Sequence, residues 1–415
     1  MGRIALCNIN YVDIENGTFS TKQTIEILDN RIVDIYDTHL HYPVDCDYVY
    51  DYTDCWALPG LVDMHVHITM SPTFDDSDYY LSPKEIVELT HANLNELRKI
   101  GVTTCRDIGS FMQSAEWVKF VLHNEASLPY VMTCGNILTY PQGHMCDFGR
   151  QVSSLSDINV FVKENFDSGA EFIKVTSDPK DTEAHNRFPN PAFPVNYLKQ
   201  IVESAAKFGL SVACHTYPSI AGVYRALQAG IRTIEHAVPF NDSMGKLFFP
   251  NTFYVPTLAT AIDICGLDSL KSANQTFDIE LLKALEKIMP IEYRYDGPVP
   301  ESISEWFNIL ITILPKAIAS NQLICTGSDA GCKGTNFSTL LREIILMCLL
   351  GATNQQALQY AITNPCNALR LRNIGKISVG YIANLIVLKD NPLTNILTLL
   401  DNVAVICNGN HISSS

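Results

Sequence analysis

The amino-acid sequence predicts an α/β protein, a TIM-type (β/α)8 barrel flanked by a small β-sandwich module built from both ends of the chain. Three observations lead to this fold class. Eight strand-like runs alternate with mostly helical stretches across residues 59–365. Short strand-like runs dominate residues 1–58 and return in residues 366–415. The length of 415 residues suits a barrel of roughly 250 residues with an accessory module. These three segments are the expected domains.

The N-terminal segment is expected to form antiparallel strands. The runs RIALCNINYVD (3–13) and QTIEILDNRIVDIYD (23–37) alternate as the strands of a hairpin do, with turns at ENGT and DN. The runs GKISVGYIANLIVLKD (375–390) and NVAVICNGNHI (402–412) read in the same way. We therefore expect the two ends of the chain to pair into one module.

The middle segment is expected to consist of βα units. Its strand candidates are residues 61–67, 102–109, 130–138, 171–177, 210–216, 231–237, 252–259 and 322–330. The first helix has a clear start, because Ser82 can cap it, Pro83 suits its first position and Glu85 completes a capping box. It is expected to end at Gly101. A doubly wound sheet is the alternative, but no GxGxxG motif follows the first strand.

Composition excludes several classes of protein. Hydrophobic residues make up 47% and charged residues 18% of the chain, which indicates a folded protein. A net charge of −15 argues against nucleic acid or an anionic membrane as a partner. The thirteen cysteines include no CxxC pair, so we expect reduced thiols. The start of the chain lacks the apolar core of a signal peptide, and we expect a cytoplasmic protein.

Two histidines follow the apolar run ALPGLV at the start of the middle segment. On a strand, His65 and His67 point to the same face, where two imidazoles can bind one metal ion. His39 and His41 have the same spacing but lie in a polar stretch that contains a proline. We expect this second pair to bind nothing.

Other polar side chains stand at the ends of later predicted strands. With the first two histidines, the set is His65, His67, Lys174, His215, His236 and Asp329. Each one alone has an ordinary explanation, such as a core histidine, a lysine at the rim or an aspartate that caps a helix. Active groups of TIM barrels lie at the carboxyl ends of the strands, so together these residues predict one active site.

Several stretches of the sequence resemble the amidohydrolase superfamily. They are LPGLVDMHVHI, GVTTCRDIG, GAEFIKVTSD, VACHTY, TIEHA, TGSDAG and NPCNALRLRNIGKISVGYIANLIVLKDNPL. They cover nearly the whole chain. The similarity is to the branch that contains imidazolonepropionase-like proteins and metal-dependent Xaa-Pro or Xaa-Arg dipeptidases.

The resemblance implies a site with two divalent metal ions, expected to be zinc. His65, His67 and Asp329 would bind the first ion, and His215 and His236 the second. Lys174, converted by carbon dioxide into a carbamate, would bridge the two ions. A hydroxide between the metals would attack a carbonyl group, and Asp329 would pass the proton to the leaving amine. The resemblance also implies that Tyr217 and His144 contact the substrate.

The expected activity is hydrolysis of an amide C–N bond in a dipeptide or N-acyl amino acid. Cyclic amides or ureides, aryl amides and lactones remain alternative substrates. A mononuclear deaminase is disfavoured by Lys174, and a scaffold without activity is disfavoured because all six ligand positions are filled. Lys180 and Arg187 are candidates to bind a substrate carboxylate. Related barrels suggest a homo-oligomer by analogy, while the substrate side chain and the native metal stay open.

Overall fold

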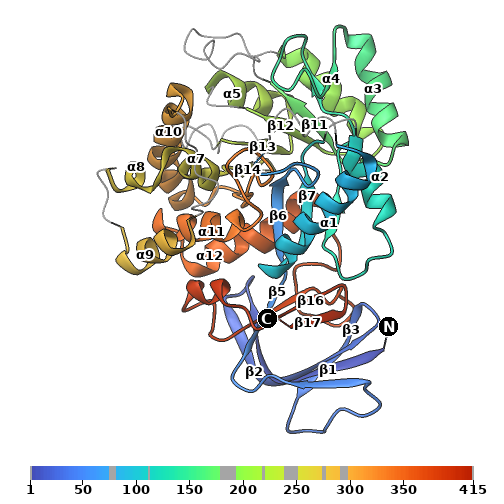
Figure 1. Ribbon diagram of the computed structural model, residues 1–415, viewed down its shortest axis with the longest axis vertical. Coiled ribbons are helices and arrows are strands. Elements are labelled where there is room, and N and C mark those ends of the chain that lie inside the picture. Colours follow the sequence, from blue (N-terminus) through green and yellow to red (C-terminus); the bar gives the residue numbers. More distant parts are fainter. Residues whose placement is uncertain are drawn as a thin grey trace.

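The chain forms a terminal strand-rich sheet below a larger region of parallel strands and helices (Figure 1). The computed structural model describes residues 2–73, 81–110, 113–177, 193–216, 220–237, 251–272, 277–289 and 298–413. Both termini lie in the lower sheet, where the first strands are blue and the last ones red. The predicted α/β class is confirmed.

The terminal sheet has eight strands in the order β17-β16-β15-β5-β1-β2-β3, with β4 also paired to β1. Their bounds are β1 (Arg3–Asp13), β2 (Thr18–Leu28), β3 (Arg31–Asp37), β4 (Tyr48–Asp51), β5 (Trp56–Pro59), β15 (Leu385–Leu388), β16 (Ala404–Cys407) and β17 (Asn410–Ser413). The predicted hairpin is present, since β1, β2 and β3 pair antiparallel in turn. Strands from both ends of the chain meet where β15 pairs with β5. The domain boundaries and the sandwich arrangement stay predictions.

Alternating side chains explain why this sheet forms. Ile25 and Ile27 on β2 are fully buried with Leu385 and Val387 on β15, in one apolar cluster. Residues two apart on a strand share a face, so the alternation seen in the sequence places one face of each strand in this core.

Parallel strands form a six-stranded sheet, β10-β9-β11-β12-β13-β14, and a three-stranded sheet, β6-β7-β8. Their bounds are β6 (Leu61–Val66), β7 (Val102–Asp107), β8 (Tyr130–Met132), β9 (Leu138–Thr139), β10 (Arg150–Gln151), β11 (Ile173–Thr176), β12 (Val212–His215), β13 (Thr233–Glu235) and β14 (Phe253–Val255). Seven of the eight predicted strands are therefore present, shorter than expected. The eighth, residues 322–330, makes only isolated parallel bridges, from Ile324 to Tyr254 and from Ala330 to Val66. These bridges place it between β14 and β6.

Helices alternate with most of these strands. They are α1 (Pro83–Lys99), α2 (Ser114–Val121), α3 (Leu155–Asp167), α4 (Val195–Ala206), α5 (Ile220–Ala229), α7 (Leu258–Cys265), α8 (Leu267–Ser272), α9 (Ile279–Ile288), α10 (Glu301–Ala319), α11 (Thr339–Leu349), α12 (Asn354–Leu358) and α13 (Asn364–Leu369). The start predicted for α1 is confirmed, because Ser82 and Glu85 form the capping box. Across the described residues, no helix combines the length and hydropathy needed to cross a bilayer.

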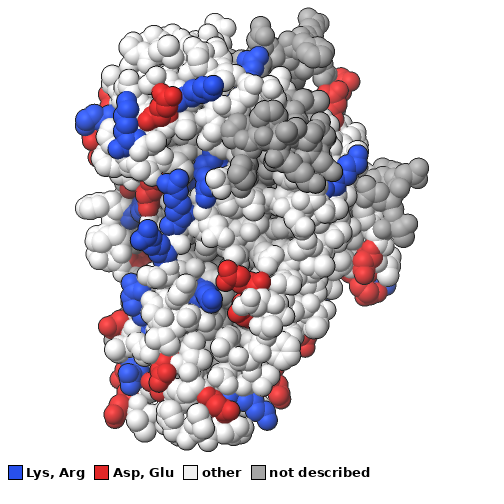
Figure 2. Space-filling view, turned by 180° about the vertical axis from the view of Figure 1, so that it is seen from behind, with Lys and Arg blue, Asp and Glu red and all other residues white. Residues whose placement is uncertain are grey.

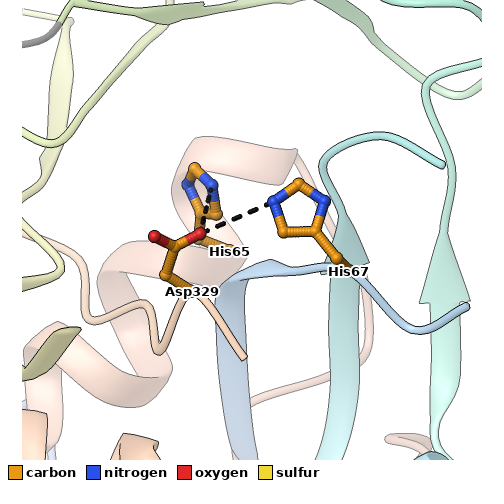
Figure 3. Close-up of side chains that lie close together, drawn as sticks. All are labelled: His65, His67 and Asp329. Carbon is orange, nitrogen blue, oxygen red and sulfur yellow. Dashed lines mark ion pairs between the residues drawn. The ribbon is translucent and has the colours of Figure 1, made fainter. Parts of the chain in front are cut away.

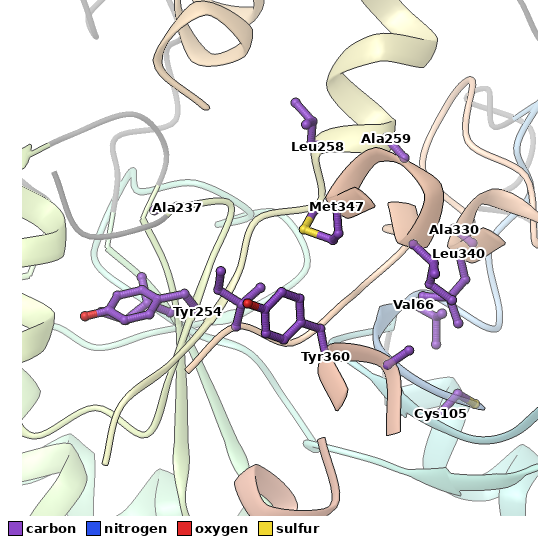
Figure 4. Packing of buried hydrophobic residues seen from close by; sticks show 14 of the residues in the cluster. Val66, Cys105, Ala237, Tyr254, Leu258, Ala259, Ala330, Leu340, Met347 and Tyr360 are labelled. Carbon is purple, nitrogen blue, oxygen red and sulfur yellow. The ribbon is translucent and has the colours of Figure 1, made fainter. Parts of the chain in front are cut away.

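The main apolar core packs helices against the parallel strands. Leu258 and Ala259 of α7 and Leu340 and Met347 of α11 lie in the same buried cluster as Val66 of β6 (Figure 4). Apolar burial of this kind stabilises by roughly 25 cal/mol per Å² removed from water. Helices α7 and α11 thus share one apolar core with β6.

Charged side chains are unevenly spread on the face in Figure 2. Lys and Arg side chains gather on its left side with some Asp and Glu among them, and much of the remaining described surface is uncharged. All thirteen cysteines lie within the described residues and none is paired in a disulfide. Their reduced state stays a prediction.

Candidate metal centre

His65, His67 and Asp329 form a buried group in which each side chain offers one ligand atom to a common point (Figure 3). The Oδ1 atom of Asp329 lies 3.2 Å from Nε2 of His65 and 3.5 Å from Nε2 of His67. All three ligand atoms fall within 4.8 Å of one another. Two imidazoles and a carboxylate at this spacing can bind one divalent cation.

Close backbone contacts place Asp329 beside the two histidines. Its amide N–H donates to the carbonyl oxygen of His65 at 2.7 Å, and its own φ of +57° turns the chain sharply there. A Cβ atom on Gly331 would lie 2.3 Å from the carbonyl oxygen of His67, and one on Gly327 would lie 2.8 Å from Cβ of His65. The glycines of TGSDAG therefore allow this segment to lie against the end of β6.

His215 and His236 continue the group from β12 and from the residue after β13. The His236 ring centroid lies 4.6 Å from that of His65 and 4.4 Å from that of His215. Burial holds the pKa of both His215 and His236 well below the usual range, and nearby positive charges lower it further. Both rings are therefore neutral at pH 7, which is the form that binds a metal ion.

Lys174 on β11 is buried, with 1% of its surface exposed. Burial lowers its pKa, the carboxylate of Glu235 raises it and the guanidinium of Arg106 lowers it again. The Lys174 charge in turn lowers the pKa of His215 and His236. Its strand β11 pairs in parallel with β12, which carries His215. A buried lysine with a lowered pKa releases its proton more readily than an exposed one.

His144 lies over the same group from the loop after β9. Its ring stacks on that of His215 with centroids 4.3 Å apart. Its carbonyl oxygen accepts hydrogen bonds from the hydroxyls of Thr139 and Thr176, at 2.9 and 2.7 Å. These bonds tie the loop to β9 and β11. The other predicted substrate contacts, Tyr217, Lys180 and Arg187, lie outside the described residues.

Sequence reasoning missed the buried partners behind the candidate ligands. Glu235 accepts a hydrogen bond from Nδ1 of His65 at 3.0 Å and pairs with Nη2 of Arg106 at 2.7 Å. Burial raises the pKa of Glu235, but the Arg106 charge and the His65 hydrogen bond hold it well below the usual range. Glu235 is thus ionised. The only available signal was an acidic residue inside the apolar TIEHA strand.

These partners orient both β6 histidines. An ionised carboxylate only accepts, so Nδ1 of His65 carries the proton that it donates to Glu235. Nδ1 of His67 likewise donates to the carbonyl oxygen of Gly109 at 2.7 Å. In each ring Nε2 then faces Asp329 and is the nitrogen that would bind a metal ion.

Replacing Glu235 by glutamine is expected to weaken metal binding by about 10–100-fold, because partners of ligating histidines contribute on this scale. The change removes the charge that pairs with Arg106 and allows the His65 ring to reorient. Zinc affinity measured by competition with a chelator tests this. Glu164→Gln is the control, because Glu164 forms only a partly exposed pair with Arg150. Equal zinc affinity in the two variants would contradict the expected role.

Comparison with known proteins agrees with this geometry. A sequence model of the amidohydrolase family matches residues 56–412, so the chain belongs to the amidohydrolase family. The buried His–His–Asp group comes from residues within the matched range. The resemblance noted in the sequence is thereby confirmed.

The individual proteins that match this chain have low sequence identity to it. An uncharacterised protein of Mycobacterium tuberculosis is 26% identical over 215 residues, 51% of this chain and 53% of that protein. The chain thus spans about half the length of the curated relatives it matches. A Xaa-Pro dipeptidase crystallised with methionine in its active site has a TM-score of 0.80 at 23% identity, over 99% of this chain and 100% of that one. A prolidase complexed with N-methylphosphonate-L-proline has a TM-score of 0.76 at 23% identity, over all of both chains. These likenesses show a shared fold.

Proposed function

We propose that this protein is a binuclear metal-dependent amidohydrolase that cleaves the amide C–N bond of a dipeptide or N-acyl amino acid. One observation supports the proposal, the buried His65–His67–Asp329 group with the rings of His236 and His215 beside it. Lys174, buried on the neighbouring strand β11, completes the proposed ligand set. The names of the dipeptidase and prolidase with the same fold support the substrate class. The proposal includes closure of the strands into an eight-stranded barrel, supported by the bridges to residues 322–330.

The donor set fits two divalent cations. The histidines, with Nε2 of His65 and His67 facing Asp329, provide nitrogen ligands, and Asp329 provides a carboxylate. An ammonium at Lys174 would repel cations, whereas its carbamate would supply two oxygen ligands. We therefore assign His65, His67 and Asp329 to one ion, His215 and His236 to the other, and carbamylated Lys174 to both. When bound, the ions would lower the pKa of a water molecule and polarise the substrate carbonyl.

The chain's own residues handle the proton and the substrate. Burial raises the pKa of Asp329, but the charge of His65 and the hydrogen bonds of His65 and His67 hold it well below the usual range. Asp329 is thus ionised and can take a proton from the attacking water and give it to the leaving amine. His144, beside His215, is placed to contact the substrate carbonyl, and we propose the same for Tyr217. Burial of the group excludes bulk water from these transfers.

Metal removal combined with a substrate screen tests the proposed function. Dialysis against a chelator should abolish hydrolysis of Xaa-Pro, Xaa-Arg and N-acyl amino acid substrates, and zinc with bicarbonate should restore it. Metal analysis should then find two ions per chain. One ion per chain would favour a mononuclear enzyme, and turnover of cyclic ureides or lactones alone would replace the substrate class.

The double variant His39→Ala/His41→Ala is the matched control. Both histidines are exposed in the terminal sheet region, where His41 stacks on Tyr36 with centroids 3.9 Å apart. Activity and metal content should stay at the level of the unmodified protein. A large loss of either would show that this pair was wrongly excluded as a ligand site.

A further inference from the structure

We propose that Glu343 on α11 is a positioning residue for His236, acting through the first turn of α7. The inference rests on the proposed function, because it treats His236 as a metal ligand. Glu343 lies outside every motif that pointed to the active site, and it contacts none of the candidate ligands in the described structure. Its effect must therefore pass through the residues between them.

Glu343 binds the N-terminus of α7 with both carboxylate oxygens. Oε1 accepts from the backbone N–H of Leu258 at 3.2 Å, and Oε2 accepts from that of Ala259 at 2.7 Å. The side chain is fully buried. The first N–H groups of a helix have no partner within the helix. Burial raises the pKa of Glu343 to about 8, so the contact depends on the two accepting oxygens and not on a full negative charge. Glu343 thus caps α7 from a different helix.

The residue that would ordinarily cap α7 is used elsewhere. Thr257 occupies the N-cap position, yet its side chain makes no capping hydrogen bond. It adopts a left-handed conformation with a φ of +49°, which is unfavourable for a β-branched residue. Such a conformation persists only where the surroundings hold it in place. The cap provided by Glu343 leaves the Thr257 hydroxyl available for another partner.

That partner is the candidate ligand. Nδ1 of His236 lies 2.8 Å from Oγ1 of Thr257, and the same hydroxyl donates its single proton to the carbonyl oxygen of Pro256 at 2.8 Å. The hydroxyl therefore accepts from His236, whose Nδ1 carries the proton. Nε2 of His236 keeps its lone pair, as a metal ligand must. Thr257 thus fixes the tautomer of His236.

A second hydrogen bond links α7 to the other side of the site. The hydroxyl of Thr260 donates to the carbonyl oxygen of Ser328 at 2.9 Å, one residue before Asp329. The far part of α7 is held by an ion pair from Asp263 Oδ2 to Nη2 of Arg342, at 2.6 Å. Neighbouring residues of α11 therefore hold both the start and the body of α7. Among the described residues of this region, only Thr257 at the start of α7 hydrogen-bonds a candidate ligand side chain.

Two single-atom changes test the proposal on the full-length holoenzyme. Glu343→Gln replaces one carboxyl oxygen by an NH2 group, and Thr257→Val replaces the hydroxyl by a methyl group. Each is expected to weaken binding of the zinc ion assigned to His215 and His236 by about 10-fold, the lower end of the effect of residues that hydrogen-bond a ligating histidine. The change should lower kcat more than it alters KM. Thr257→Ser keeps the hydroxyl and should restore metal affinity.

Asp263→Asn is the matched control, because it weakens another buried contact between the same two helices. A purely structural role for Glu343 predicts that Glu343→Gln and Asp263→Asn both lower Tm and that neither changes zinc affinity in the folded protein. That result, or unchanged zinc affinity in Thr257→Val, would overturn the proposal. A loss of zinc affinity confined to the Glu343 and Thr257 variants would support it. If Glu343→Gln fails to fold, the Thr257 pair decides.

A readout without metal separates this inference from the proposed function. Nitrogen-15 spectra of histidine-labelled, metal-free protein report which ring nitrogen of His236 carries the proton. We expect the Nδ1–H form in the unmodified protein and a mixture of tautomers in Thr257→Val. If the protein binds no metal but shows this shift, the proposed function fails while the positioning by Thr257 stands. Identical spectra in both proteins would overturn the positioning itself.

Discussion

Asp329→Asn is expected to leave the protein folded while reducing kcat by about 10²–10⁴-fold, the usual contribution of a general acid–base residue. Asparagine has the shape of aspartate but cannot take up a proton from water and release it to an amine. The Oδ1 atom of Asp329 is the one oxygen that lies near Nε2 of both His65 and His67. No other described carboxylate shares this position, because Glu235 faces the opposite nitrogen of His65.

Asparagine is the appropriate replacement because of the backbone at this position. Asp329 has a φ of +57°, a conformation that asparagine tolerates far better than alanine does. Its backbone N–H still donates to His65, and an amide oxygen can still accept from the thiol of Cys332, 3.4 Å away. Tm should therefore change little.

Metal content must be measured together with kcat, because Asp329 is also a candidate ligand. Two ions per chain with a greatly reduced kcat would assign the loss to proton transfer. Loss of one ion would assign it to metal binding. Turnover close to that of the unmodified protein, with the metal content intact, would remove Asp329 from the proton pathway.

The sequence predicted those parts of the fold that local patterns determine. Period-two alternation located the terminal strands, and the capping box at Ser82 located the start of α1. The prediction of the eighth strand was only partly right. Its apolar run is typical of a strand, but the backbone turns at Asp329, which has a positive φ, and Gly327 and Gly331 lie close against the end of β6. The structure therefore shows isolated bridges there.

The candidate ligands could be predicted because each lies in or directly after a run of residues that the sequence predicts as a strand. Their buried partners could not be predicted in this way. Glu235 and His65 are hydrogen-bonded although 170 residues separate them in the sequence, and Glu343 and Leu258 although 85 residues do. No periodicity links such pairs, since they depend on which helices and strands pack together. Thr257 shows the difficulty most clearly. The sequence predicts it within a strand, residues 252–259, whereas it precedes the first residue of α7 and makes no capping hydrogen bond.

Lys174→Ala is expected to reduce the metal content from two ions to one or fewer per chain and to reduce kcat at least as much as Asp329→Asn. In the proposed carbamate, the buried amine would first release a proton, and its nitrogen would then bond to the carbon of carbon dioxide. A second proton would leave, so that a cation would become an anion. Alanine would remove the proposed bridging group and leave a space in an apolar strand, where Lys174 is almost fully buried.

Chemical rescue distinguishes loss of the carbamate from general damage to the strand. A short carboxylic acid such as acetate or propionate can enter the space left by Lys174 and offer two oxygens to the metals. We expect it to restore part of the activity of Lys174→Ala and none of the activity of Asp329→Asn. Lys207→Ala, at an exposed position after α4, is the control and should keep both ions. Two ions per chain in Lys174→Ala would contradict the carbamate bridge, because both ions would then bind without Lys174.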